Sequence, residues 1–147
     1  MTQVDRTSVS AVVTAMYRTL SFRPGSKPDW SQERDLFEPN ARLVRNSDKG
    51  RETFDLEGYI RNFESMIDKG ELPSFYEKEI SSHVDQFGNI AHVFSTYEGK
   101  LDEASEPLFR GINSIQLLQT DGRWRIVSII WQRETSTLQL PASGSRS

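Results

Sequence analysis

The chain contains no cysteine among its 147 residues. That absence excludes disulfides, thiolate metal sites and cysteine nucleophiles, although it does not decide the compartment. Only two histidines are present, and a catalytic zinc site takes three convergent protein ligands. We therefore expect neither a bound metal nor a cofactor.

Long apolar runs and an excess of positive charge are also missing. No run approaches the roughly 20 apolar residues that span a bilayer, and the polar start MTQVDRTS is not followed by the apolar part of a signal peptide. A formal net charge of −3 gives no general attraction to nucleic acid or to an anionic membrane. With 35% hydrophobic and 27% charged residues, the composition is that of a globular domain. We expect a soluble cytoplasmic protein with neither nucleic acid nor membrane as a partner.

Helical signals dominate the first half of the chain. Ser8 can cap a first helix, which the stretch RPGSKP ends. Asp29 can cap a short second helix that carries Trp30, Leu36 and Phe37, and residues 41–46 alternate like a strand. A third helix is expected to begin near Asp55, after a polar turn.

After Pro73 the pattern changes to a period of two residues. It predicts strands over residues 75–87, 90–101, 108–120 and 123–134, joined in pairs by tight turns. Three helices followed by a long antiparallel meander predict an α+β domain with helices over one face of the sheet. We expect a single domain over residues 1–136 and a disordered tail over 137–147.

The final strand is apolar on both of its faces. Simple alternation gives an inward set, which would meet the helices, and an outward set, which needs another cover. A second copy of the chain is the simplest cover, and the C-terminal tail folding over this face is the alternative. The inward set is Val127, Ile129 and Trp131, and the dimer-face candidates are Phe94, Ile112, Trp124, Ile126 and Ile130.

Alternation also divides the polar residues of the neighbouring strands. It places Glu77, Glu79 and Asp85 on the same face as His83, where an exposed strand edge explains them as well as a site does. It places His92 with Phe94 on the dimer side. We expect structural or surface roles for both histidines.

Three stretches carry a resemblance to a known family: DWSQERDLFEPNARLV (29–44), IAHVFSTYEGK (90–100) and RGINSIQLLQTDGRWRIVSIIWQRE (110–134). They resemble the nuclear transport factor 2-like superfamily, which includes ketosteroid isomerase, SnoaL-type polyketide cyclases and scytalone dehydratase, and especially its small bacterial members of unassigned function. The resemblance covers roughly residues 6–135. It implies a cystatin-like cone, with three N-terminal helices packed in the concave face of a curved, mainly antiparallel sheet. It also implies an apolar pocket open at one end and a dimer through the outer face of the sheet.

The resemblance also locates the catalytic positions of ketosteroid isomerase in this sequence. Its carboxylate base falls at about Arg45, which stays protonated at neutral pH and cannot take a proton. Its protonated aspartic acid matches Asn113, whose amide can still donate a hydrogen bond. Its tyrosine falls near Met16, next to Tyr17. The steroid isomerase set is not matched, and we assign no catalytic residue.

What remains is an apolar pocket with a few polar groups, the usual form of a small-molecule site. A guanidinium matches a carboxylate bidentately, so Arg45 together with Asn113 predicts a small apolar or carboxylate-bearing ligand. Alternatively, Arg45 pairs with Glu38 or Asp48 or reaches solvent, and Asn113 only forms hydrogen bonds with the backbone. The pocket candidates are Tyr17, Trp30, Arg45, Phe63, Ser95, Tyr97, Asn113, Ile115, Ile129 and Trp131.

Two functional hypotheses remain open, and a third fits less well. The first is a homodimer that binds a small molecule in the manner of the isomerases and cyclases, with the reaction unassigned. The second is a non-catalytic dimeric protein-interaction module, which a cone filled by Trp30, Phe63 and Trp131 would favour. The third, an accessory subunit resembling the small subunit of ring-hydroxylating dioxygenases, would need long extra segments that this chain lacks.

Overall fold

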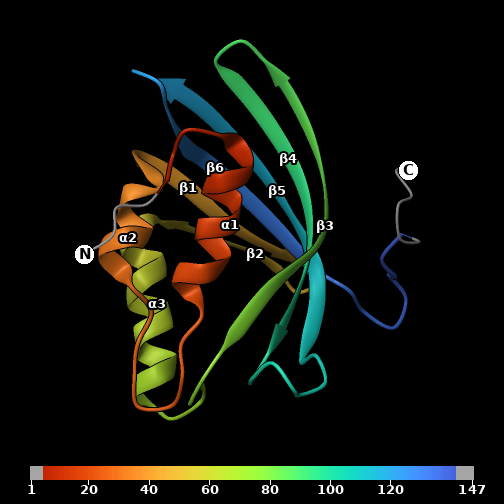
Figure 1. The fold of residues 1–147 in the computed structure, drawn as a ribbon. Helices are drawn as coiled ribbons and strands as arrows, with labels where there is room; N and C mark the ends of the chain where they lie inside the picture. The colour runs from red at the N-terminus through yellow and green to blue at the C-terminus, as the bar shows by residue number, and fades with distance from the viewer. Residues whose placement is uncertain (1–4, 142–147) are drawn as a thin grey trace.

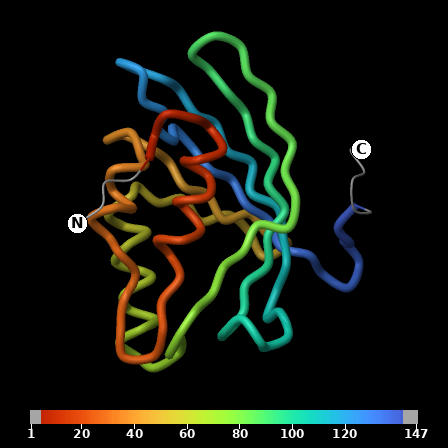
Figure 2. Tube along the Cα trace, viewed as in Figure 1, coloured from red at the N-terminus to blue at the C-terminus, as the bar shows by residue number. Residues whose placement is uncertain are grey.

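Six strands form one curved sheet, and three helices lie in its concave side (Figures 1 and 2). The computed structural model describes residues 5–141. This is the α+β, cystatin-like cone that the resemblance implies. The helices are α1 (Val9–Leu20), α2 (Trp30–Asp35) and α3 (Leu56–Asp68), and the strands are β1 (Phe37–Ser47), β2 (Gly50–Asp55), β3 (Tyr76–Phe87), β4 (Ile90–Lys100), β5 (Phe109–Thr120) and β6 (Arg123–Arg133).

The strand order in the sheet is β2-β1-β6-β5-β4-β3. The β1–β6 pair is parallel and the other pairs are antiparallel, so the sheet is mixed but mainly antiparallel. The two hairpins expected at the tight turns are present, β3 with β4 and β5 with β6. The meander predicted from the period of two is confirmed.

The helices begin at the three predicted caps. In Ser8, Asp29 and Asp55 a side-chain oxygen accepts a hydrogen bond from the backbone N–H three residues further on, at 3.1, 3.2 and 2.7 Å. Each bond satisfies an N–H that has no partner within the helix. The apolar stripes of α1 and α3 then pack against the sheet and form the core.

The segment between α2 and α3 differs from the sequence prediction. The second helix ends at Asp35, and Phe37 already belongs to β1. The polar stretch after Ser47 was expected to be a turn, but Gly50–Asp55 forms the edge strand β2. Most of β2 is exposed, so its sequence carries no alternation of apolar and polar residues.

A bulge in β6 corrects the predicted division of its two faces. The register with β5 skips Val127, so that Leu117 lies opposite Ile126. Residues that lie opposite one another share a face of the sheet, and both are buried in the core. Trp124 and Ile126 are 2% and 0% exposed. Placing them on a dimer face was wrong, because the extra residue of a bulge reverses the alternation.

A second bulge, in β3, corrects the position of the acidic residues there. The register with β4 skips Ile80, so Glu79 lies opposite the buried Tyr97 and not on the face of His83. His83 hydrogen-bonds Asp85 at 3.0 Å on the other side of the sheet. The bulge therefore turns Glu77 and Glu79 toward the helices.

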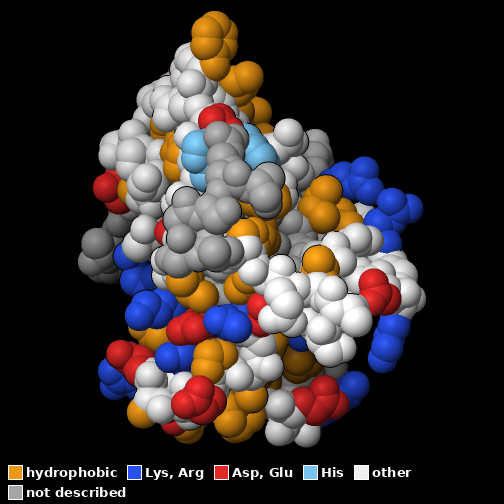
Figure 3. Space-filling model, turned by 90° about the vertical axis from the view of Figure 1, so that its right-hand side faces the viewer, with side chains coloured by type: hydrophobic (Ala, Val, Ile, Leu, Met, Phe, Trp, Pro, Cys, Tyr) orange, Lys and Arg blue, Asp and Glu red, His pale blue; other side chains and the backbone are white. Residues whose placement is uncertain are grey.

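The outer face of the sheet keeps the other three dimer-face candidates. Phe94 and Ile130 are 48% and 49% exposed, and Ile112 is half-buried. Hydrophobic and histidine side chains lie together on this side of the molecule (Figure 3). The histidine on β4, His92, bonds the Ser114 hydroxyl at 3.1 Å.

The first part of the expected tail lies beside the outer face. The backbone N–H of Leu140 donates to the Glu134 carboxylate at 2.9 Å. Together with Leu138, this segment borders a groove of about 400 Å³ that Phe94 and Ile130 also line. The remainder of the tail, residues 142–147, lies outside the described residues.

Candidate functional site

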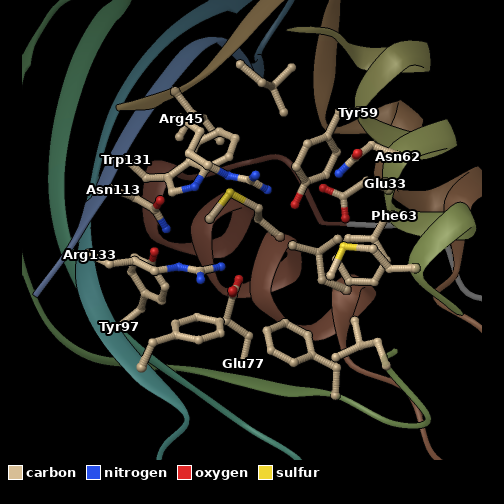
Figure 4. A pocket seen from close by; sticks show the side chains of 18 of the residues that line it. Glu33, Arg45, Tyr59, Asn62, Phe63, Glu77, Tyr97, Asn113, Trp131 and Arg133 are labelled. Carbon is tan, nitrogen blue, oxygen red and sulfur yellow. The ribbon is translucent and has the colours of Figure 1, made fainter. Parts of the chain in front are cut away.

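A cavity of about 100 Å³, partly open to solvent, lies between the helices and the sheet. Much of its wall is apolar, and polar side chains enter it from both layers (Figure 4). The helices supply Glu33 from α2 with Tyr59 and Asn62 from α3, and the sheet supplies Arg45, Glu77, Asn113 and Arg133.

The structure brings six of the ten predicted pocket residues to this cavity. Trp30 does not line it, because its ring packs edge-on against Phe63 at 5.5 Å between centroids. Tyr17 and Ser95 bond each other at 2.6 Å behind the wall, and Ile115 is fully buried. The six lining residues are Arg45, Phe63, Tyr97, Asn113, Ile129 and Trp131.

Arg45 is shared between the cavity and the protein surface. Its Nη1 donates to the Glu52 carboxylate at 2.9 Å. Glu52 belongs to β2, the strand that the sequence did not predict, so the partner is neither Glu38 nor Asp48. The Nε–H of Arg45 is buried and donates to no group of residues 5–141. That donor is available to a molecule in the cavity.

A second guanidinium, that of Arg133, was missed from the sequence. Its central carbon lies 3.7 Å from the centre of the Phe109 ring, a cation–π contact. Figure 4 shows its charged end directed into the cavity toward Glu77. The signal was present, because Arg133 follows the inward Trp131 by two residues on the same strand.

Glu77 was also missed as a site residue. The residue as a whole is half-buried, but its carboxyl group lies inside the cavity. Burial raises the pKa of this carboxyl to about 8, while the nearby Arg133 acts in the opposite direction. A neutral carboxyl at pH 7 is the expected result.

Glu33 is a third group that the sequence analysis did not select. Burial raises its pKa to about 8, against a hydrogen bond with Thr19 that lowers it. The single proton of the Thr19 hydroxyl can reach two acceptors, the Glu33 carboxyl and the Met16 carbonyl, the latter at 3.2 Å. A protonated Glu33 that donates to Thr19 leaves the Thr19 proton for Met16, which satisfies all three groups.

The charges of the cavity follow from these protonation states. With Glu33 and Glu77 neutral at pH 7 and Arg45 paired with Glu52, the guanidinium of Arg133 leaves the cavity positive. The two carboxyls can still donate hydrogen bonds, and their pKa values near 8 suit proton exchange at neutral pH. The arrangement favours an anionic ligand with hydrogen-bonding groups.

Two further classes of site are not found in the part of the chain that the structure describes. Within residues 5–141, no three His, Cys, Asp or Glu side chains gather closely enough to hold a metal ion. Over the same residues, no helix has the length and apolar character needed to cross a membrane.

Comparisons with known proteins support the fold and not the chemistry. No family model and no curated protein matches the sequence. Three similar solved structures are of proteins of unknown function. A cystatin-like protein from Nostoc punctiforme PCC 73102 has a TM-score of 0.68 at 12% identity, over 87% of this chain and 90% of that one. NTF2-like proteins from Shewanella baltica OS155 and Silicibacter pomeroyi DSS-3 have TM-scores of 0.63 and 0.60 at 16% and 21% identity, over 86% of this chain and 91% and 92% of theirs. The chain therefore has the cystatin-like fold of the nuclear transport factor 2-like proteins.

Proposed function

We propose that this chain is a cytoplasmic protein that binds a small carboxylate-bearing molecule in its cavity. The observation that carries the proposal is the convergence of Arg45 and Arg133, from two strands, on one cavity whose acidic groups are neutral at pH 7. Arg45 pairs with Glu52 through Nη1 and Arg133 is exposed as a residue, but the buried Nε–H of Arg45 has no partner among residues 5–141. A carboxylate ligand supplies the partner that the neutral Glu33 and Glu77 do not.

The size of the cavity restricts the ligand. A protein cavity of about 150 Å³ holds one benzene molecule, so about 100 Å³ encloses roughly four non-hydrogen atoms. Since the cavity is partly open, a larger ligand can extend outward from it.

The same geometry favours this proposal over a protein-interaction module with a filled cone. Trp30 packs beside the cavity, and Phe63 and Trp131 line a cavity of about 100 Å³ without filling it. Polar groups that line an open cavity have no evident role in a surface used only for protein contacts. The proposal is one of binding, and no reaction is assigned.

Replacing either arginine by methionine tests the proposal. Arg45→Met and Arg133→Met keep the apolar stem and remove the charged fork. Each charge-assisted hydrogen bond contributes about 1.5–3 kcal/mol, so propanoate should bind about 10- to 100-fold more weakly, with little change in melting temperature. Titration followed by NMR chemical shifts measures the affinity.

The matched control is Arg110→Met, because Arg110 pairs with Glu134 at 3.1 Å and does not line the cavity. Its affinity for propanoate should equal that of the unmodified protein. Equal binding of propanoate and uncharged propanamide would refute the proposal, since the arginines would then recognise no charge.

We also propose that two copies of the chain pair through the outer face of the sheet. Phe94 and Ile130 lie on either side of Ser114 in one row across three strands, each about half exposed. Ile112 lies two residues before Ser114 on the same face. Burying such a row against a symmetry mate removes apolar surface from water.

Ile130→Glu tests the pairing, because each copy would place a charge in the apolar contact. We expect light scattering to give the dimer mass for the unmodified protein and the monomer mass for the variant. Leu108→Glu, at an exposed apolar residue outside this row, should remain a dimer. A monomer mass for the unmodified protein would rule the pairing out.

A further inference from the structure

A row of three hydrogen bonds runs from the wall of the cavity to the edge of the sheet. The amide Nδ2 of Asn113 donates to the Tyr17 hydroxyl at 2.9 Å. The Tyr17 hydroxyl and the Ser95 hydroxyl are 2.6 Å apart, and Ser95 donates to the Glu79 carboxylate at 2.5 Å. Four elements contribute one member each, β5, α1, β4 and β3. Of the four residues, only Asn113 lines the cavity.

The direction of this row is set at its Glu79 end. The Ser95 hydroxyl donates its single proton to the Glu79 carboxyl group, which lies on the edge strand. Ser95 must then accept from the Tyr17 hydroxyl. The Tyr17 hydroxyl has donated its proton to Ser95, so its oxygen must accept a hydrogen bond from Asn113. The observed bond from Asn113 Nδ2 has this direction. The row therefore holds the NH₂ group of Asn113 toward Tyr17.

Because the NH₂ group of Asn113 points toward Tyr17, the amide oxygen Oδ1 is the atom left to face the cavity. This oxygen accepts no hydrogen bond from the residues that the structure describes. The guanidiniums of Arg45 and Arg133 only donate, and the neutral carboxyls, the hydroxyls of Tyr59 and Tyr97 and the Asn62 amide can donate as well. Asn113 is thus an acceptor in a site otherwise rich in donors.

We propose that the cavity selects small hydroxy acids, whose carboxylate is bound by the arginines while the hydroxyl donates to Oδ1 of Asn113. This rests on the proposed function, because the arginines must bind the carboxylate first. Glu79, Ser95 and Tyr17 act as positioning residues, since they set which atom of Asn113 the ligand meets. A keto acid of equal size presents a carbonyl oxygen to Oδ1, and two acceptors then face one another without a proton between them.

Lactate, pyruvate and propanoate are suitable probes, because they share a carboxylate and differ in the group on the adjacent carbon. We expect lactate to bind about 10-fold more tightly than pyruvate, the equivalent of one hydrogen bond. If all three bind equally, the proposed function stands and this inference fails. If none of them binds, the proposed function fails as well.

Ser95→Ala separates the positioning role from a structural one. It cuts the row, so Tyr17 becomes free to donate to Oδ1 of an amide that has turned over, and the ratio of the lactate and pyruvate affinities should fall close to one. Glu79→Leu, at a half-buried residue of the edge strand, should lower the ratio in the same way. Glu79→Gln keeps an acceptor for Ser95 and should retain the preference for lactate.

The control is Ser74→Ala, because Ser74 is a buried serine whose hydroxyl donates to the Leu101 carbonyl, outside the row. It should leave the affinity ratio unchanged whatever it does to stability. An unchanged ratio in Ser95→Ala and Glu79→Leu would overturn the positioning role.

Discussion

Ile126→Glu is expected to abolish folding, although the sequence alone placed Ile126 on a dimer face. Ile126 is fully buried among the core residues, and its backbone N–H donates to the Leu36 carbonyl at 2.8 Å. The substitution removes a packed side chain and puts a carboxylate in its place. The combined loss is on the order of 5 kcal/mol or more, which is comparable to the whole stability of an ordinary domain.

The comparison that tests this is between neighbouring positions of one strand. Ile130→Glu introduces the same charge at a half-exposed position of β6 and should leave the fold intact. Circular dichroism and urea titration should show a cooperative transition for Ile130→Glu and none for Ile126→Glu. A folded Ile126→Glu monomer of normal stability would mean that Ile126 faces outward and that the bulge at Val127 is wrong.

The elements that the sequence predicted well are those with strong local signals. Helix starts at Ser8 and Asp29 depend on a side chain that reaches a backbone N–H three residues away, which is a purely local contact. The hairpin at Asp121 and Gly122 needs positive φ values, which both residues adopt. The edge strand β2 had no such signal, because one exposed polar segment looks like another.

Neither bulge was predicted from the sequence, because alternation was assumed to continue along the whole strand. For β6, the position of the tight turn was enough to predict the correct face. Counting back from Thr120 opposite Arg123 places Leu117 opposite Ile126, and alternation puts Leu117 on the same face as the pocket candidates Asn113 and Ile115. For β3, the bulge at Ile80 lies far from the turn at Gly88, so counting from that turn gives no warning of it.

The cavity residues were predicted in part for the same reason. Residues on regular stretches, such as Asn113 and Trp131, could be assigned to the inward face by alternation. Glu77 enters the cavity only because of the bulge that follows it. Glu33 belongs to a short polar helix, and its burial depends on the contact with Thr19 in α1, which is a tertiary contact.

The stability of the protein is expected to fall steeply as the pH rises from 5 to 9, and Glu33→Gln should remove much of that fall. The pKa of Glu33 rises on folding from 4.5 to about 8 because of burial. Between these values the unfolded chain has lost the proton that the folded protein keeps, so the unfolded state binds fewer protons and stability decreases with pH. The full contribution is present below about pH 4.5 and is lost above about pH 8.

The difference between the two pKa values corresponds to about 5 kcal/mol at most, since each unit is worth about 1.4 kcal/mol. Glutamine has no proton to lose, and its NH₂ group can donate to the Thr19 hydroxyl as the protonated carboxyl does, so Glu33→Gln should be the more stable protein at pH 9. Glu103→Gln, at an exposed loop residue, changes the same charge and should reproduce the unmodified pH profile. Urea midpoints measured across this range decide the matter, and parallel profiles for the unmodified protein and Glu33→Gln would show that Glu33 is ionised in the folded protein. Glu77, whose pKa is raised in the same direction, accounts for the part of the slope that should persist in Glu33→Gln.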